Sequence, residues 1–260
     1  MPRLVESKGL YHVAHRMLSA DSWLCEVSGR RSFRLDTAED SLRALSDSAS
    51  VERRDVQALL HEDVFVYAKV PVCAVEAVGV LEGLGFHVVD TGLAFAMESK
   101  DDAPRATSRV RPASSSDEPA VARLAARAFS TSRFHLDPLF GRATANRVKE
   151  AWASSYFAGT RGQAMVVAQA DNDVLGFLLL LKPDSKTAVI DLIAVDESSR
   201  GSGLGRDMIA FAWELFPGVT HMNVQTQAAN VGAARFYESM GFSFDGATYC
   251  LHAYGAGGFA

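Results

Sequence analysis

Apolar residues in the second half of the chain recur with two different periods, and each period predicts one kind of element. Spacings of three and four predict helices over residues 119–129, 143–157, 204–215 and 231–240. Short apolar runs bounded by turn residues predict strands over 109–112, 164–170, 174–182, 187–195 and 221–225, and a strand pair over 242–254. The run over 187–195 is apolar throughout, which favours a strand covered on both faces. Residues 131–138 lead to a proline and are predicted to form a loop.

The first half of the chain contains a weaker copy of the same order. A strand over 64–69, an apolar helix reaching residue 84, the pair Gly85-Phe86 and a following strand match the order of residues 221–244. This similarity predicts a structural pseudo-repeat, although a Gly-Phe turn arising by chance remains an equal alternative. We therefore expect an α/β (α+β) protein with a mixed central sheet flanked by helices, preceded by a smaller α/β domain.

A change in composition divides the two halves. Residues 98–118 replace the apolar texture on either side with charged residues, serine and proline, as a linker does. The predicted domains are 1–104 and 105–260. A length of 260 residues suits two such domains, since one domain usually has about 100 to 150 residues.

Composition and charge exclude several classes of function. A formal net charge of −5 lacks the basic character that nucleic acids or anionic membranes select, so neither is an expected partner. Cys25, Cys73 and Cys250 are far apart and form no metal-binding spacing, which predicts no metal site and fits a reducing cytoplasmic setting. The longest apolar run is far shorter than the ~20 residues that span a bilayer.

The most informative segment follows the buried strand predicted over 187–195. After a polar turn, Arg200-Gly201-Ser202-Gly203-Leu204-Gly205 opens a helix. Unpaired N–H groups and a partial positive charge at a helix N-terminus bind anions, and glycines let a diphosphate approach these groups. No Lys follows Gly205 as a Walker loop requires, and the spacing of a Rossmann loop is not met either. A phosphate-bearing cofactor of another kind is therefore expected.

The order Arg-x-x-Gly-x-Gly resembles the diphosphate loop of the GNAT superfamily of N-acetyltransferases, with Arg200, Gly203 and Gly205 at its defined positions. A second segment resembles another motif of that superfamily: Asn230 at a helix start, Tyr237 later on the helix, then Gly241-Phe242. The resemblance implies a GNAT fold with a degenerate GNAT-like half in front, and acetyl-CoA as cofactor. The implied cofactor-binding residues are Leu192, Ile193, Ala194, Val195, Arg200, Gly201, Ser202, Gly203, Leu204, Gly205, Asn230, Ala233 and Tyr237.

Residues 129–138, the aromatic residues of the second helix and the pair Thr226-Gln227 narrow the resemblance to the dTDP-fucosamine acetyltransferase group. These enzymes transfer acetyl to sugar amines and also carry a small front domain. This chain has the full glycine loop, whereas the loop is shortened in the enzyme that gives the group its name. The identity of the amine acceptor therefore stays open. The candidate acceptor-binding residues are Arg133, Phe134, His135, Asp137, Trp152, Tyr156, Thr226 and Gln227.

Transfer of acetyl from a thioester needs a neutral amine held against the carbonyl, an N–H facing the developing oxyanion, and a proton for the leaving thiolate. By its place in the motif, Tyr237 is the candidate acid. Asp191 is a candidate base because a carboxylate on an apolar strand must be paired or face a site. His135 and a chain of waters are equal alternatives.

Three functions remain open from the sequence. The first is acetylation of a small-molecule amine, with a nucleotide-linked amino sugar foremost, by a monomer or a homodimer. The second is a non-catalytic module that binds acyl-CoA, and the third is acetylation of a protein or peptide amine. Phe134, Trp152 and Tyr237 could each be core residues instead of site residues.

Overall fold

The computed structural model describes residues 17–99, 107, 109–171 and 173–255, which divide into two compact units. The first unit holds residues up to Thr91 and those from Ala247 onward, and the second runs from Gly92 to Gly246. The boundary expected between residues 104 and 105 lies outside the described residues and stays a prediction. Two strands, β4 (His87–Glu98) and β10 (Ser243–Tyr254), contribute to both units.

The sheet of the first unit has the strand order β1-β2-β3-β10-β4. Its own strands are β1 (Leu18–Ala20), β2 (Arg31–Leu35) and β3 (Val64–Pro71), with β2 parallel to β3 and β10 antiparallel to β3. The helices are α2 (Ser22–Ser28), α3 (Glu39–Ser46), α4 (Val51–Leu59) and α5 (Val75–Glu82). Leu45, Val56 and Leu81 of the last three helices pack with alternate residues of β3 in one buried cluster.

The sheet of the second unit has the order β10-β4-β9-β8-β7-β6-β5. Its further strands are β5 (Val110–Pro112), β6 (Ala164–Ala170), β7 (Asp173–Leu181), β8 (Thr187–Val195) and β9 (His221–Gln227). Its helices are α6 (Glu118–Ala128), α7 (Arg133–Leu136), α8 (Arg142–Phe157), α9 (Leu204–Leu215) and α10 (Val231–Ser239), with short 3-10 turns η1 (Ser115–Asp117) and η2 (Glu197–Ser199).

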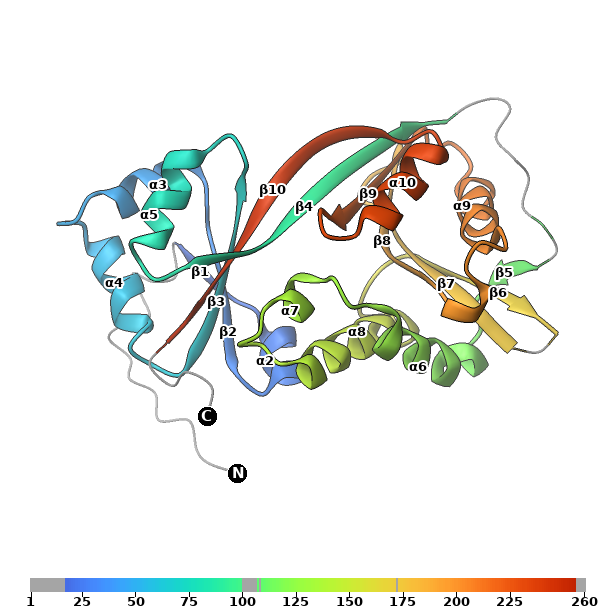
Figure 1. Ribbon diagram of the computed structural model, residues 1–260, viewed down its shortest axis with the longest axis horizontal. Helices are drawn as coiled ribbons and strands as arrows, with labels where there is room; N and C mark the ends of the chain where they lie inside the picture. The colour runs from blue at the N-terminus through green and yellow to red at the C-terminus, as the bar shows by residue number, and fades with distance from the viewer. Residues whose placement is uncertain (1–16, 100–106, 108, 172, 256–260) are drawn as a thin grey trace. The chain divides into compact units, whose positions relative to one another are not determined.

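Helices cover both faces of this second sheet (Figure 1). Alternate side chains of β6, β7 and β8 enter two buried clusters, one shared with α9 and α10 and the other with α6 and α8. Strand β8 serves both, since Ile190 lies in the first cluster and Leu192 in the second. The expected α/β class with a mixed, helix-flanked sheet is confirmed, as is a central strand over 187–195 that is covered on both sides.

Three details differ from the sequence predictions. Residues 133–136 form the short helix α7 inside the predicted loop; the helix ends before the Asp137-Pro138 pair, where proline disfavours helical backbone. The predicted strand pair over 242–254 is one continuous strand, β10. Strand β4 is far longer than the short strand expected after Phe86, because it has a partner strand in each unit.

The predicted strand-helix-strand copies are present as β3-α5-β4 and β9-α10-β10. In each copy the first strand pairs in parallel with the strand before it, β2 or β8. Its other neighbour is the last strand of the opposite copy: β3 pairs with β10, and β9 pairs with β4. The two copies therefore exchange their final strands, which a sequence period alone does not reveal.

Candidate active site

The glycine loop lies between η2 and α9 and leaves the helix start without a side-chain cap. Gly203 is the N-cap residue, with a left-handed backbone (φ 88°), and among the described residues no side chain caps the first turn of α9. Gly201 is also left-handed (φ 79°), and a Cβ added there would meet no atom within 4 Å. Backbone N–H groups at the start of α9 are thus open to an anion.

Contacts behind the loop hold it in place. The Arg109 guanidinium donates to the carbonyl of Ser202 at 3.3 Å and to the carboxylate of Asp207 at 2.6 Å. The Thr107 hydroxyl donates to the same carboxylate at 2.7 Å. A Cβ at Gly205 would lie 3.1 Å from the Phe236 ring, so this glycine lets α9 approach α10 closely. The loop is therefore fixed by its own unit, independently of any ligand.

Strands β8 and β9 pair over only part of their length. Their parallel ladder runs from Thr187 opposite His221 to Ile190 opposite Val224 and extends no further in the described residues. Beyond it, residues 192–195 pair with β7, and residues 225–227 of β9 pair with β4. The backbone edge of β8 from 191 to 195 that faces away from β7 is therefore free of a strand partner. This opening lies along residues 192–195, which the sequence predicted as cofactor-binding residues.

Asn230 and Ala233, two expected cofactor residues, interact at the start of α10. The Asn230 side chain accepts from the N–H of Ala233 at 3.2 Å, so it caps the helix. Ala233 packs against the buried cluster that α9 and α10 share with the sheet. Their predicted contact with a cofactor stays a prediction.

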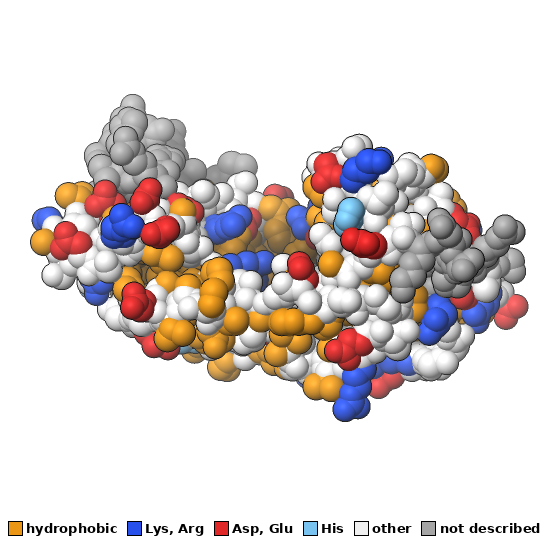
Figure 2. All heavy atoms as spheres, turned by 90° about the horizontal axis from the view of Figure 1, so that it is seen from above, with side chains coloured by type: hydrophobic (Ala, Val, Ile, Leu, Met, Phe, Trp, Pro, Cys, Tyr) orange, Lys and Arg blue, Asp and Glu red, His pale blue; other side chains and the backbone are white. Residues whose placement is uncertain are grey.

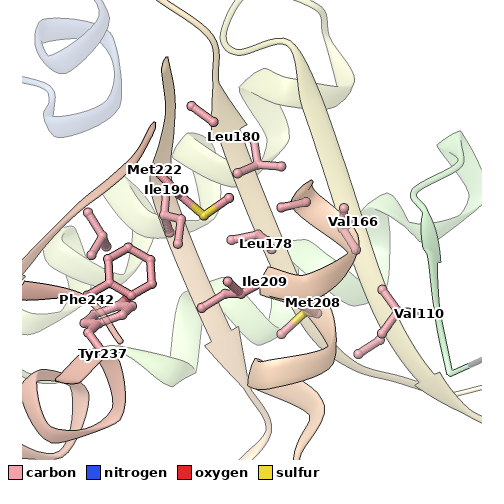
Figure 3. Packing of buried hydrophobic residues seen from close by; sticks show 14 of the residues in the cluster. Val110, Val166, Leu178, Leu180, Ile190, Met208, Ile209, Met222, Tyr237 and Phe242 are labelled. Atoms are coloured by element: carbon pink, nitrogen blue, oxygen red, sulfur yellow. The ribbon is translucent and has the colours of Figure 1, made fainter. Parts of the chain in front are cut away.

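Tyr237 is packed among aromatic residues. Its side chain is 3% exposed and lies beside Phe242 in the buried cluster (Figure 3). Its ring centroid is 5.5 Å from that of Phe242 and 6.1 Å from that of Phe95. Within the described part of the chain its hydroxyl has no hydrogen-bond partner. Burial raises the pKa of Tyr237 above its usual value near 10, which keeps the phenol protonated. Tyr237 is therefore packed like a core residue, and its phenol stays protonated and able to donate.

Asp191 lies at an irregularity of β8 and is surrounded by donors. Its carboxylate accepts from Trp152 Nε1 at 2.7 Å, from the Tyr156 hydroxyl at 2.8 Å, and from Nε and a terminal nitrogen of Arg161 at 2.7 and 2.8 Å. Although burial alone would raise it, the hydrogen bonds from Arg161 and Trp152 hold the pKa of Asp191 below its usual range. The structure thus joins a candidate base to two candidate acceptor residues, Trp152 and Tyr156.

The segment around α7 holds the other candidate acceptor residues. His135 uses both ring nitrogens, with the Ser132 hydroxyl at 2.6 Å and the Asn146 side-chain oxygen at 2.9 Å, and burial lowers its pKa. Phe134 is buried against Phe140, at 4.6 Å between ring centroids. Such packing is that of a core residue.

The remaining candidates lie beside α7 and at the end of β9. Arg133 lies over the Phe134 ring at 4.2 Å. The buried Asp137 carboxylate accepts from the N–H of Leu139 at 2.9 Å. At the other location, Thr226 and Gln227 lie opposite Leu93 and Gly92 of β4.

Three cationic residues and one asparagine of the candidate site were not predicted from the sequence. Arg161 pairs with Asp191, Arg109 braces the loop, Lys149 lies 4.8 Å from the Trp152 ring, and Asn146 meets His135. The one signal for Arg161 was a carboxylate on an apolar strand, which needs a cation. Asn146, Lys149, Trp152 and Tyr156 follow each other along α8 at spacings of three and four, so they share one face of the helix.

Charges are mixed on the molecular face drawn in Figure 2: Lys and Arg side chains are interspersed with Asp and Glu, and neither sign forms a broad continuous surface there. Among the described residues, no helix combines the length and apolar character needed to cross a bilayer. These observations leave the glycine loop and the opening beside β8 as the features that point to a ligand.

Two curated proteins are similar to this chain. Spore coat polysaccharide biosynthesis protein SpsD of Bacillus subtilis is 32% identical over 138 residues, which are 52% of this chain and 47% of SpsD. The chain thus matches about half of that relative. The dTDP-fucosamine acetyltransferase of Escherichia coli O6:H1 is 27% identical over 190 residues, which are 72% of this chain and 80% of that protein.

Solved structures share the fold at low sequence identity. A conserved protein of unknown function from Staphylococcus epidermidis has a TM-score of 0.61 at 18% identity, covering 86% of this chain and 85% of its own. A GCN5-related N-acetyltransferase from Sphaerobacter thermophilus has a TM-score of 0.55 at 15% identity, covering 86% of this chain and 72% of its own. Residues 128–242 match the profile of the acetyltransferase (GNAT) family, a range that includes the glycine loop, the β8 opening and Tyr237. The matched range is less than half of this chain, so residues 128–242 are similar to the GNAT family of acetyltransferases, and the chain shares the fold of these two solved structures.

Proposed function

We propose that this protein transfers the acetyl group of acetyl-CoA to the amine of a small molecule, with a nucleotide-linked amino sugar as the preferred acceptor. The uncapped start of α9 beside the unpaired edge of β8 carries the proposal, because together they offer a diphosphate site and a strand edge for an extended arm. The names of the two curated relatives, a polysaccharide biosynthesis protein and an acetyltransferase of an amino sugar, support the acceptor class.

The residues of the loop fit a diphosphate. Gly201 and Gly203 adopt left-handed backbone that other residues take only with strain, and neither presents a Cβ to the ligand. The N–H groups from Leu204 to Arg206 would hold the phosphate oxygens, with Arg200 supplying charge. The backbone of Leu192, Ile193, Ala194 and Val195 would hold the pantetheine arm, with an N–H near Leu192 or Ile193 facing the thioester oxygen. Asn230 and Ala233 would border this site.

The reaction needs little more than positioning and one proton donor. Bound acetyl-CoA supplies an acetyl thioester with a good leaving group. The acceptor nitrogen forms a bond to the carbonyl carbon as the carbon-sulfur bond breaks, and the nitrogen gives up one proton. Tyr237 donates its phenolic proton to the departing sulfur, and a buried phenol without a described partner is suited to this. Solvent then restores the proton of Tyr237.

No side chain is assigned as the base. The four hydrogen bonds on the Asp191 carboxylate and its lowered pKa make it a weak proton acceptor. Both ring nitrogens of His135 are already engaged. We therefore favour water molecules as the route by which the amine loses its proton.

The acceptor would lie along the face of α8 that carries Lys149, Trp152 and Tyr156, close to α7. The positive charges of Lys149 and Arg142 both act on His135, and Arg133 lies on α7 itself. This excess of cations suits an acceptor with phosphate groups, and the aromatic rings suit a base or sugar face. Phe134, Asp137, Thr226 and Gln227 would shape this site rather than react.

Replacing Tyr237 with Phe tests the proposal. We expect turnover to fall about 10²-fold, in the range of a lost acid, while the acetyl-CoA affinity measured by calorimetry stays unchanged. Tyr249→Phe is the control, since Tyr249 packs in the cluster of the first unit and should leave both quantities unchanged.

Two outcomes would contradict parts of the proposal. Wild-type protein that releases no heat with acetyl-CoA would refute the cofactor assignment. Binding without acetyl transfer to any amino sugar, polyamine or peptide amine would indicate a non-catalytic acyl-CoA module.

A further inference from the structure

The irregularity in β8 falls at one residue. In the antiparallel ladder between β7 and β8, Leu179 lies opposite Leu192, and the next residue, Leu180, lies opposite Ile190. Asp191 is therefore an extra residue in β8, as in a β-bulge. The bulge explains why Ile190 and Leu192 enter clusters on opposite faces of the sheet, although residues two apart in a regular strand share a face.

The bulge begins where the ladder to β9 ends. Ile190 is the last residue of β8 paired with β9, so Asp191 is the first without that partner. A residue that has lost ladder bonds needs another restraint to keep a defined conformation. One of the two amides next in sequence, that of Leu192 or of Ile193, is the group we expect to face the thioester oxygen.

The restraint is the set of side chains around the Asp191 carboxylate. Arg161 approaches it with two nitrogens and also stacks on Trp152, with the guanidinium carbon 4.3 Å from the ring centroid. Trp152 and Tyr156 add one hydrogen bond each from α8. The Asp191 side chain is 8% exposed, whereas that of Arg161 is 38% exposed, so the carboxylate end of the pair is the shielded one.

The backbone after α8 is shaped around the same contacts. Gly162, with φ 70°, lies directly beneath the Tyr156 ring, and a Cβ there would fall 1.9 Å from a ring carbon. Only glycine fits this position, and it follows Arg161 immediately in the chain. The turn that presents Arg161 to Asp191 is therefore built for that contact.

We propose that Asp191 and Arg161 act as positioning residues: the ion pair on the buried Asp191 carboxylate, completed by Trp152 and Tyr156, fastens the β8 bulge to α8 and so sets where the amide at Leu192 or Ile193 meets the thioester. The inference rests on the proposed acetyl transfer, and it gives Asp191 a role other than that of the base. A misplacement of about 1 Å at a reacting centre can lower a rate about 10²-fold, so the bulge need not be lost for catalysis to suffer.

Asp191→Asn and Arg161→Lys test the proposal together. The first keeps the shape of the side chain but removes its charge, and the second keeps the charge but loses the planar fork that binds two oxygens. We expect each to lower kcat by 10- to 100-fold with the acetyl-CoA affinity unchanged. The double variant should lose no more than the worse single variant, since both act through one contact. The pH profile of kcat should keep its wild-type shape in Asp191→Asn.

Asp117→Asn is the matched control. Asp117 forms a similar buried two-oxygen pair with Arg111 in the same unit, but at the start of α6. It should lower stability while leaving kcat within about twofold. If it lowers kcat as much as Asp191→Asn does, general loosening explains the effect and the proposal fails. Loss of one limb of the pH profile in Asp191→Asn, with Arg161→Lys near wild type, would instead make Asp191 the base.

A readout independent of activity separates this inference from the proposed function. Trp152 contacts both Arg161 and Asp191. Its fluorescence, isolated by subtracting the spectrum of the Trp152→Phe variant, should therefore shift in Asp191→Asn and in Arg161→Lys. A shift without any acetyl transfer by the wild-type protein would refute the proposed function but support the attachment of the β8 bulge to α8. An unchanged spectrum in both variants would refute that attachment. Should Asp191→Asn fail to fold, Tyr156→Phe removes one of the four hydrogen bonds and should give smaller effects of the same kind.

Discussion

The two copies of the strand-helix-strand unit, β3-α5-β4 and β9-α10-β10, share one topology and differ in chemistry. Aligning Gly85-Phe86 with Gly241-Phe242 places Leu81 of α5 opposite Tyr237 of α10. Both side chains are buried in the cluster of their own unit, so either residue satisfies the packing. Only the tyrosine adds a hydroxyl. The fold therefore requires a large apolar side chain at this position, and the proposed reaction requires the hydroxyl that only tyrosine adds.

The helices before the two copies differ in the same way. Neither helix has a side-chain cap from the part of the chain that the structure describes, but α9 starts after left-handed Gly203, whereas α3, which follows β2, starts after Ala38 in extended backbone. Two acidic residues, Glu39 and Asp40, occupy the first turn of α3 and would repel a phosphate. The first copy thus retains the architecture without an anion site.

The largest expected effect comes from separating the copies. A fragment of residues 105–260 lacks β4, so β9 loses its seven paired residues and the cluster shared with α9 and α10 loses Phe95. Losing a buried Phe side chain alone costs about 3–5 kcal/mol. We expect no cooperative transition in urea by circular dichroism. A fragment of residues 87–260, which keeps β4, should regain one, and cooperative unfolding of the shorter fragment would refute the strand exchange.

A smaller expected effect, on acetyl-CoA affinity, distinguishes a glycine of the loop from a glycine that only ends a helix. Gly203→Ala and Gly29→Ala both place a side chain on left-handed backbone, with φ of 88° and 74°. Each should lower the free energy of unfolding by about 1–2 kcal/mol. Only Gly203→Ala should weaken acetyl-CoA binding, by about tenfold in calorimetry, because Gly29 ends α2 in the first unit. Equal affinities in the two variants would contradict the placement of the diphosphate.

The smallest effect concerns alkaline stability. Burial raises the pKa of Tyr237 in the folded state above its unfolded value of about 10, so the folded state holds the proton more tightly. Its contribution is therefore complete below pH 10 and is lost as the pH rises toward the folded pKa. We expect Tyr237→Phe to lose less stability than wild type between pH 9 and 11 in urea titrations. Parallel curves would mean that the phenol is not desolvated.

Much of the second unit could be predicted from the sequence because its signals are local. The apolar run of β8 and the glycines before α9 each act through neighbouring residues, and the structure has the strand and helix where these signals place them. Helix α7 was missed because four residues show no periodicity. The role of Arg161 was missed because its partner lies thirty residues further along the chain.

The exchange of β4 and β10 was beyond sequence reasoning for a related reason. Both strands are apolar enough to belong to either sheet, and their partners lie more than a hundred residues away. The twelve-residue lengths of β4 and β10, which exceed that of a usual strand and fit two partners each, became known only from the structure. Asp191 was correctly singled out as a paired carboxylate, while its proposed role changed once the four donors were known.

The exchanged strands also impose an order on biosynthesis. Strand β4 emerges from the ribosome before β9, so the second sheet meets a finished neighbour as it forms. The first sheet, by contrast, must wait for residues 248–254 to pair with β3, although β3 was made long before. During that interval the β3 edge is open to other chains, a known route to aggregation. Chaperone demand during translation should therefore concentrate on the first unit, although the proposed chemistry belongs to the second.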